Sequence, residues 1–205
     1  MNKIIAIMGP SGVGKTTLAN NLVLHNGFAI PRHTTTRGKR KDDEEGFYRY
    51  LTHDEYRELY NQGKFLISSG DGAEIKKKFG NFYGVLKEDC VEAFEKSDTI
   101  ILFTSYKDIR ALVNLNNSGF EISIVNLTFI NIEESMRRRL IGNTERDQTM
   151  EDINSRIKWA LKDTHDYFRE LQIYPDITVY TDRADIDETY QTVCEKLKLK
   201  RKGKN

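Results

Sequence analysis

A glycine-rich segment near the N-terminus constrains this chain more than any other feature. It reads GPSGVGKT over residues 9–16, directly after the apolar run IIAIM at 4–8 and directly before a helical pattern. This order predicts a buried strand, a tight turn and a helix, so that backbone N–H groups and the positive end of the helix meet at one point. Such a point attracts anions. The segment therefore predicts a site for the phosphates of a nucleoside triphosphate.

The fixed positions of this segment fit the phosphate-binding loop pattern G-x-x-x-x-G-K-[ST]. We expect the loop amides to hold phosphate oxygens, Lys15 to reach the outer phosphates and the hydroxyl of Thr16 to bind Mg²⁺. The predicted nucleotide-binding residues are Gly9, Ser11, Gly12, Val13, Gly14, Lys15, Thr16 and Thr17. A phosphate loop alone does not separate kinases from GTPases or motor ATPases. The fate of the last phosphate has to be inferred from the rest of the chain.

Composition narrows the class of protein. Among 205 residues, 32 Lys and Arg stand against 31 Asp and Glu, and the net charge of +1 favours neither nucleic acid nor a membrane. The two cysteines lie far apart and outside any metal-ligand spacing, which is typical of a reducing compartment. No apolar stretch is long enough to span a membrane, and the run at 4–8 is too short for the core of a signal peptide. We expect a cytoplasmic protein without membrane or nucleic-acid partners.

The C-terminal stretch 196–205 is locally basic. It contains no aromatic residue that would stack on a nucleic-acid base, so we interpret it as a helix end rather than a nucleic-acid contact. The sequence leaves the oligomeric state open and is compatible with a homodimer.

Apolar periodicity predicts an α/β fold. Runs such as 99–103, which are apolar apart from their first residue, are typical of strands that a parallel sheet buries on both faces. We predict strands at 4–8, 28–30, 47–52, 99–103, 122–130 and 177–180, and helices at 16–25, 53–62, 109–115, 132–140, 152–171 and 186–197. The polar stretch 31–46 and the glycine-rich stretch 68–84, a loop or hairpin, interrupt this alternation. We therefore expect one domain, with a parallel-sheet core flanked by helices over 1–30 and 96–205 and an inserted subdomain over 31–95.

Three further motifs follow the phosphate loop: TTTRGKR at 34–40, GFYRY at 46–50 and FGNFYG at 79–84. Two arginines three residues apart, joined by tyrosines from elsewhere, can clamp a phosphate, because a guanidinium fork binds two phosphate oxygens at once. In order and near-spacing these segments resemble the guanylate kinase family. The hallmarks of that family are a G-P-S-G-x-G-K loop, a T-T-R-x-x-R segment, a G-x-x-Y-x-F strand and a G-N-Y-Y-G turn. The resemblance runs from about Ile4 to the closing helix.

The resemblance implies a P-loop kinase fold and a nucleoside monophosphate kinase with nucleotides as its small-molecule partners. Such an enzyme moves the γ-phosphoryl group of ATP, with Mg²⁺, to an acceptor, here GMP, which becomes GDP. It also implies an acceptor-binding role for the insertion and an arginine-bearing lid at about 140–156. The residues near Thr181 and Asp182, on the side of the donor base, leave ATP and GTP open as donors.

Individual roles are implied by position. Arg37, Arg40, Tyr48 and Tyr83 resemble the residues that hold the acceptor phosphate, and Asp43 and Glu44 compete for an acidic position nearby. The expected catalytic residues are Lys15, Arg37, Arg139, Arg146 and Arg156, and the expected acceptor-binding residues are His33, Arg37, Arg40, Tyr48, Ser68, Glu74, Tyr83 and Ser105. Asn143 competes with Arg146, because the lid is longer than usual. Arg137 and Arg138 fit equally well as a solvated helix face.

The departures from the family lie where guanine would be recognised. Ile67 follows Phe65-Leu66 in place of an acid, and Glu74 recovers that role only if the extra residues of its loop precede it. The family's aspartate pair is absent from LFTS at 102–105, and Val85 replaces a hydroxyl. His33 stands where the family tends to have serine, either as a charged group near the incoming anion or as a plain loop histidine.

Three hypotheses follow. The first is a guanylate kinase with a divergent acceptor site, and the second is a related kinase for another phosphorylated acceptor, such as a different nucleoside monophosphate or a ribose bisphosphate. The third is a guanylate-kinase-like binding module without turnover. Such modules typically carry a degraded phosphate loop, and the intact Gly14, Lys15 and Thr16 argue against that class.

Overall fold

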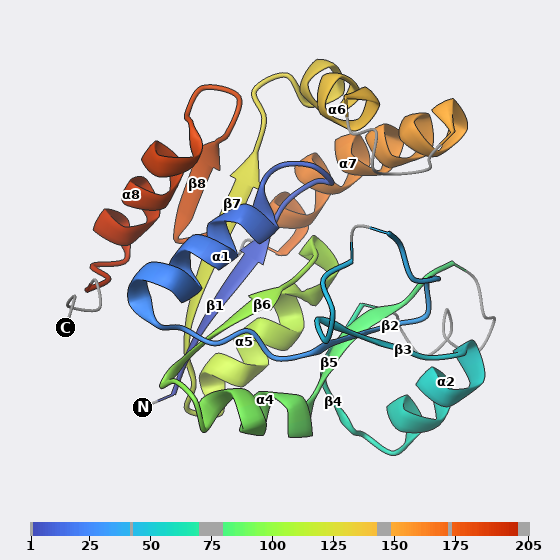
Figure 1. The fold of residues 1–205 in the computed structure, drawn as a ribbon, viewed down its shortest axis with the longest axis vertical. Coiled ribbons are helices and arrows are strands. Elements are labelled where there is room, and N and C mark those ends of the chain that lie inside the picture. Colours follow the sequence, from blue (N-terminus) through green and yellow to red (C-terminus); the bar gives the residue numbers. More distant parts are fainter. Residues whose placement is uncertain (1, 42, 70–79, 143–148, 172–173, 201–205) are drawn as a thin grey trace.

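Two four-stranded sheets organise the chain, whose computed structural model describes residues 2–41, 43–69, 80–142, 149–171 and 174–200 (Figure 1). The core sheet has the order β6-β1-β7-β8 and is parallel throughout. Its strands are β6 (Thr99–Phe103), β1 (Lys3–Met8), β7 (Glu121–Thr128) and β8 (Ile177–Tyr180). The insertion sheet has the order β3-β2-β5-β4 and mixes parallel with antiparallel pairs. Its strands are β3 (Tyr48–Tyr50), β2 (His33–Thr35), β5 (Tyr83–Leu86) and β4 (Phe65–Ser68). The predicted parallel α/β core is confirmed.

Helices surround both sheets. They are α1 (Lys15–Asn26), α2 (His53–Asn61), α4 (Lys87–Phe94), α5 (Ile109–Asn117), α6 (Ile132–Ile141), α7 (Met150–Leu171) and α8 (Ile186–Lys196), with the 3₁₀ turn η1 (Tyr106–Asp108) before α5. All but α4 lie where the sequence predicted a helix, with ends shifted by one or two residues. Helix α4 was not predicted. Its Cys90 and Ala93 are buried in the core, which ties this polar helix to the core sheet.

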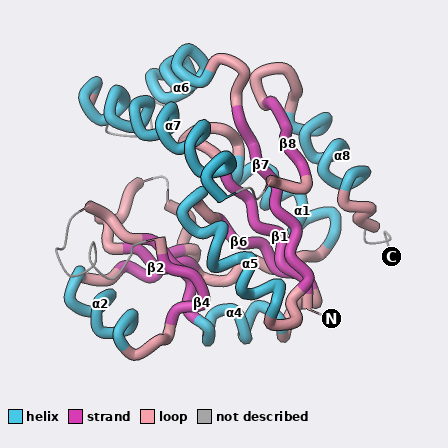
Figure 2. The backbone as a smooth tube through the Cα atoms, turned by 180° about the vertical axis from the view of Figure 1, so that it is seen from behind, coloured by secondary structure: helices cyan, strands magenta, loops and turns pink. Residues whose placement is uncertain are grey.

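Strand β1 shows why the core sheet is buried on both faces. Ile5 and Ile7 belong to an apolar cluster with residues of α1 and α8, whereas Ile4, Ala6 and Met8 belong to a second cluster with residues of α4 and α5. All five side chains are at most 3% exposed. Figures 1 and 2, which view the molecule from opposite sides, show α1 and α8 over one face and α5 over the other. Because both faces of the strand are buried, polar side chains on either face would be removed from water, and the strand is apolar throughout.

Strand β2 (His33–Thr35) lies inside the polar stretch 31–46, where the sequence predicted no strand. Successive threonines favour extended backbone because their side chains are β-branched. Backbone groups of Phe82 satisfy the hydroxyls of Thr35 and Thr36, whereas the buried hydroxyl of Thr34 has no hydrogen-bond partner among the described residues. Thr35 Oγ1 donates to the Phe82 carbonyl at 3.0 Å, and Thr36 Oγ1 accepts from the Phe82 amide at 2.9 Å.

Two other predictions can be compared with the structure. The strand predicted at 28–30 is wrong, because the chain passes the edge of β6 with a single parallel bridge between Ala29 and Ile100. The stretch 68–84, predicted as a loop or hairpin, contains the end of β4 and the start of β5, whose antiparallel pairing agrees with the hairpin alternative. Residues 70–79, between these strands, lie outside the described residues.

The carboxyl ends of the core strands bring the phosphate loop and several other candidate site residues to one edge. The phosphate loop follows β1, Thr104 and Ser105 follow β6, and Thr181 follows β8. Ligands of open α/β sheets bind outside this edge, so the fold places the site there. Within the described residues, no helix combines the length and the apolar character that crossing a membrane requires.

Candidate active site

The phosphate loop turns between β1 and α1 in a shape that needs glycine. Gly9 has φ 138°, and a Cβ atom there would lie 2.1 Å from the Leu127 carbonyl oxygen. Gly14 has φ 102° and is the N-cap of α1. Residues with side chains rarely adopt these conformations. The glycines of the motif are therefore required by the turn itself, and the turn directs the unpaired N–H groups at the start of α1 into the loop.

Lys15 opens α1 and folds back over the loop. Its Nζ donates to the carbonyl oxygens of Gly9 at 2.7 Å and Pro10 at 2.8 Å. Carbonyl groups carry no net charge, so these bonds fix the ammonium without cancelling its charge. Val13, 1% exposed, packs into the core and anchors the turn from below. The loop thus holds a cation together with the amides of a helix N-terminus.

Thr16 and Thr17 are exposed in the first turn of α1. Mg²⁺ takes oxygen ligands, keeps several waters and is commonly shared with substrate phosphates. Among the described residues, no group of three or more His, Cys, Asp and Glu side chains could hold a metal ion. A single hydroxyl beside a phosphate loop fits a magnesium ion whose other ligands are phosphate oxygens and waters.

Arg139, on α6, joins the phosphate loop to the end of β8. Its guanidinium donates to the Gly12 carbonyl at 3.1 Å and to the Thr181 carbonyl at 2.6 Å, and it lies 5.0 Å from the ring centroid of Phe129. Burial, followed by the charge of Arg138, lowers the pKa of Arg139, whereas Asp182 acts in the opposite direction. Of the expected lid arginines, Arg139 is therefore brought against the loop.

The other lid arginines lie in different surroundings. Arg156, half-buried on α7, lies one helical turn after Asp152, whose pKa is lowered by hydrogen bonds from Thr149 and by the charge of Arg156. Arg137 donates to Glu133 at 3.2 Å and to Asn154 at 3.1 Å. These bonds favour the helix-surface interpretation of Arg137. Arg146 and its competitor Asn143 lie outside the described residues.

Arg37, in the loop after β2, is buried against a carboxylate. Its two terminal nitrogens donate to Asp43 at 2.6 and 2.5 Å, and one of them also donates to the Gly38 carbonyl at 2.9 Å. The side chains of Arg37 and Asp43 are 5% and 7% exposed. Burial by itself lowers the pKa of Arg37, but the bonds and the charge of Asp43 outweigh it and raise the pKa above its ordinary value. Of the two competing acids, the structure therefore brings Asp43 to Arg37.

Tyrosines surround this ion pair. The guanidinium of Arg37 lies 4.6 Å from the ring centroid of Tyr48 and 5.9 Å from that of Tyr50, and Tyr50 donates its hydroxyl to Asp43 at 2.6 Å. Tyr83 interacts electrostatically with both Arg37 and Tyr48. The structure thus gathers Arg37, Tyr48 and Tyr83, three of the expected phosphate-holding residues. Arg40 joins them through its backbone N–H, which donates to Asp43 at 2.7 Å.

His33 links the two sheets as a neutral ring. Its Nδ1 lies 2.9 Å from the Pro31 carbonyl, and its Nε2 accepts the Phe103 amide at 3.1 Å, which fixes the proton on Nδ1. The ring is 5% exposed and packs against Phe47, Tyr48 and Phe103. Burial lowers its pKa to about 4, with the bond to Pro31 opposing the shift. The interpretation of His33 as a charged group was wrong, because burial among aromatic rings disfavours the protonated form.

The remaining acceptor-binding candidates are bonded within the protein. Ser68 Oγ lies 2.9 Å from the Tyr56 hydroxyl, and Ser105 donates its hydroxyl to Asp108 at 2.9 Å to close η1. Ile67 is 4% exposed and packs into the apolar cluster around Ile4 and Leu102, so it supplies no polar group. Glu74 lies outside the described residues.

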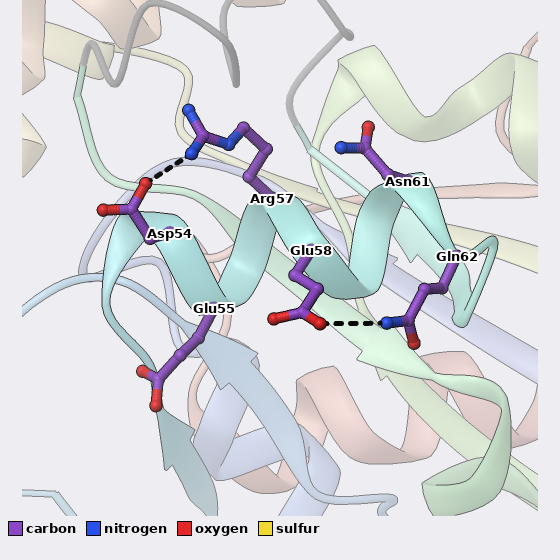
Figure 3. Close-up of a pocket in the computed structure, with 6 residues that line it drawn as sticks. All are labelled: Asp54, Glu55, Arg57, Glu58, Asn61 and Gln62. Carbon is purple, nitrogen blue, oxygen red and sulfur yellow. Dashed lines mark hydrogen bonds and ion pairs between the residues drawn. The ribbon is translucent and has the colours of Figure 1, made fainter.

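The outer face of α2 carries a separate polar depression, which Figure 3 shows in close-up. Its side chains are Asp54, Glu55, Arg57, Glu58, Asn61 and Gln62. Arg57 pairs with Asp54 at 2.6 Å, and Gln62 donates to Glu58 at 3.2 Å. None of the candidate site residues lines this depression, and its one cation among these side chains, Arg57, is paired with Asp54. We interpret it as a solvated helix face.

No role was assigned to Tyr50 from the sequence. The family motif has phenylalanine at the corresponding position, and this difference was the only signal in the sequence that a hydroxyl is added there. In the structure that hydroxyl lies at the centre of the Arg37 cluster.

The fold and the loop together define a class, an α/β protein of the P-loop kinase type. The crystal structure of guanylate kinase from Anaplasma phagocytophilum aligns with a TM-score of 0.65 over 96% of this chain and 85% of that chain, at 20% identity. A sugar kinase from Janibacter sp. HTCC2649 aligns with a TM-score of 0.50 over 97% and 96%, at 13% identity. At these identities the likeness establishes the fold alone.

The sequence comparisons are more specific. The family model for guanylate kinase matches residues 1–199. The guanylate kinase of Trichodesmium erythraeum is 28% identical over 193 residues, which cover 93% of each chain. The guanylate kinase of Clostridium tetani is 29% identical over 161 residues, 78% of this chain and 71% of that protein. The chain belongs to the guanylate kinase family.

Proposed function

We propose that this chain is an ATP-dependent nucleoside monophosphate kinase that converts GMP to GDP. The observation that carries the proposal is the match of the guanylate kinase family over residues 1–199, on a chain whose phosphate loop keeps Gly14, Lys15 and Thr16. The curated relatives from Trichodesmium and Clostridium bear the name of that activity. An intact loop separates this proposal from a binding module without turnover.

The proposed mechanism uses alignment and charge rather than covalent chemistry. The amides of the phosphate loop and Lys15 hold the outer phosphates of ATP, and Arg139 supports the loop through Gly12. Thr16 offers its hydroxyl to Mg²⁺, which would neutralise phosphate charge when bound. Arg37, Tyr48 and Tyr83 hold the acceptor phosphate so that one of its oxygens attacks the γ-phosphorus.

We also propose that the insertion over 31–95 closes on the core and that the lid over about 140–156 adds Arg146 and Arg156 to the reacting phosphates. Closure keeps water from accepting the phosphoryl group. The unpaired state of Cys90 and Cys194 supports a reducing compartment, for which we propose the cytoplasm.

A second acceptor class is favoured by the end of β6. Phe103 and Ser105 stand where the family carries aspartates, and Phe103 packs on the neutral ring of His33. An apolar and hydroxyl lining would read guanine less strictly than carboxylates do. The alternative acceptor is therefore another nucleoside monophosphate or a ribose bisphosphate.

A panel of phosphorylated acceptors, assayed with Mg·ATP for ADP release, tests the proposal. We expect the highest kcat/KM with GMP. If Glu74 reads guanine, Glu74→Gln should weaken GMP far more than AMP, by about 2 kcal/mol, because a carboxylate accepts two N–H groups of guanine. An unchanged ratio of GMP to AMP would mean that Glu74 does not contact the base or that guanine is not the base of the acceptor. Arg37→Ala serves as the matched control, since it should weaken all phosphorylated acceptors alike. A higher kcat/KM for another acceptor would show that GMP is not the preferred acceptor. If no acceptor led to ADP release, the chain would be a binding module without turnover.

A further inference from the structure

The orientation of Arg37 depends on a carboxylate that is itself held from several sides. Asp43 Oδ2 accepts from Arg37 at 2.6 Å, from the Arg40 amide at 2.7 Å and from the Tyr50 hydroxyl at 2.6 Å, while Oδ1 accepts from the second terminal nitrogen of Arg37. A carboxylate with this many donors cannot rotate without breaking several bonds at once. The orientation of Arg37 is thus fixed by Asp43, which the Arg40 amide and the Tyr50 hydroxyl hold in place.

The bonds to Asp43 and Gly38 use three of the five N–H groups of the Arg37 guanidinium. The remaining two belong to Nε and to the outer side of one terminal nitrogen. The hydroxyl of Tyr48 lies within hydrogen-bonding reach of the guanidinium, Tyr83 acts on it electrostatically, and the ring of Tyr48 lies 4.6 Å from its central carbon. A phosphate that binds Arg37 therefore has to accept from the N–H groups that Asp43 and Gly38 do not use, and these lie beside the two tyrosines.

Tyr50 contacts the carboxylate that holds Arg37. Its hydroxyl bonds the carboxylate rather than the guanidinium, and its ring lies farther from Arg37, at 5.9 Å. The phenylalanine of the family motif would keep the ring and lack this bond. The hydroxyl is therefore an addition of this chain to the support of Arg37.

We propose that Tyr50 is a positioning residue for the acceptor phosphate: its hydroxyl holds Asp43, and Asp43 directs the remaining N–H groups of Arg37, beside Tyr48, toward that phosphate. This inference rests on the proposed function, but it concerns the phosphate group and not the base. Tyr50 touches no reacting atom. Its effect passes through Asp43 and Arg37.

Tyr50→Phe tests the inference, because it removes one hydroxyl and keeps the ring. We expect the KM for GMP to rise roughly five- to tenfold, less than the full effect of losing a hydrogen bond to a charged group because Asp43 keeps its other donors, with kcat within about twofold and the KM for ATP unchanged. Affinity for guanosine, which has no phosphate, should stay the same. Tyr60→Phe, on a partly buried ring of α2 that does not bond Asp43, is the matched control and should leave all these constants unchanged.

A double-mutant cycle identifies the route. In an Asp43→Asn background, Tyr50→Phe should change the KM for GMP by less than about twofold, since the carboxylate through which it acts is gone. Additive effects would overturn the inference, as would an unchanged KM in Tyr50→Phe. Equal weakening of GMP and guanosine, with a lower melting temperature, would mean that Tyr50 only supports the fold.

Wild-type turnover of GMP separates this inference from the proposed function. If GMP is not phosphorylated, the proposed acceptor is wrong, and the same comparison is made with the nucleoside monophosphate preferred in the panel and its nucleoside. The expected contrast between phosphorylated and unphosphorylated ligand is the same, and its absence would overturn the inference.

Discussion

The two halves of the candidate site hold their cations in different ways. In the donor half, Lys15 and Arg139 are anchored by backbone carbonyls of the phosphate loop and of Thr181. In the acceptor half, Arg37 is anchored by the carboxylate of Asp43. Carbonyl groups position a cation and leave its charge, whereas a carboxylate positions it and cancels the charge.

This difference matches the ligands that each half is proposed to bind. A triphosphate carries a high negative charge, and a loop that combines Lys15, Arg139 and a helix N-terminus attracts it strongly. An acceptor carries one phosphate, and the Arg37 cluster, nearly neutral before binding, recognises it by the direction of its donors. We infer that charge dominates in the donor half and geometry in the acceptor half.

The largest expected effect comes from removing charge in the donor half. Lys15→Ala should lower kcat by a hundredfold or more, because losing a preorganised cation at the transferring phosphate costs about 3 kcal/mol or more in the barrier. The melting temperature should change little, since Lys15 is only partly buried and bonds the loop's own carbonyls. Steady-state kinetics and thermal unfolding check both statements. Near-normal turnover would contradict the phosphoryl-transfer role of the loop.

The next effect concerns the contact between the insertion sheet and the core sheet. There, His33 of β2 accepts a hydrogen bond from the amide of Phe103 at the end of β6. The pKa of His33 is lowered from 6.5 to about 4, chiefly by burial. Between these pH values the unfolded chain binds a proton that the folded chain does not, so the free energy of unfolding falls as the pH falls. The loss should reach about 3 kcal/mol at pH 4 and be absent above pH 7.

His33→Gln provides the comparison, because glutamine keeps a polar side chain that does not titrate. Denaturant unfolding at pH 7 and pH 4.5 should show a larger loss of stability in the wild type than in this variant. The groups that face the ring, the Pro31 carbonyl, the Phe103 amide and the rings of Phe47, Tyr48 and Phe103, carry no charge at these pH values. Parallel losses in the two proteins would show that His33 titrates as it does in water.

The sequence predicted the donor half better than the acceptor half, for a physical reason. The phosphate loop is local: eight consecutive residues contain the glycines, the lysine and the hydroxyl, and the flanking apolar run and helix follow directly. The cluster around Arg37 combines residues of β3 and β5 with Arg37 and Asp43 from loops. From the sequence, only the family resemblance indicated that Arg37, Tyr48 and Tyr83 act together.

Two residues of the acceptor half show what pattern reasoning misses. Spacing left Asp43 and Glu44 as equal candidates, and only the folded loop brings Asp43 to Arg37. His33 reads as a loop residue in a polar stretch, but burial between aromatic rings and two backbone bonds make it neutral. Burial and partners decided both cases, and neither is encoded within a few residues of sequence.

The smallest expected effect tests whether the donor half also needs geometry. Arg139→Lys keeps the charge, but one ammonium group cannot bond Gly12 and Thr181 together as the planar guanidinium does, nor lie flat over Phe129. We expect the KM for ATP to rise about three- to fivefold, near 1 kcal/mol, with the KM for GMP unchanged. Arg137→Lys, on the helix surface beside Glu133, is the matched control and should change neither constant. If Arg139→Lys also changed nothing, charge alone would suffice in the donor half, and the contrast with the oriented Arg37 would be sharper. If instead it cost as much as Lys15→Ala, both halves would depend on the direction of their donors, and the division between charge and geometry would fail.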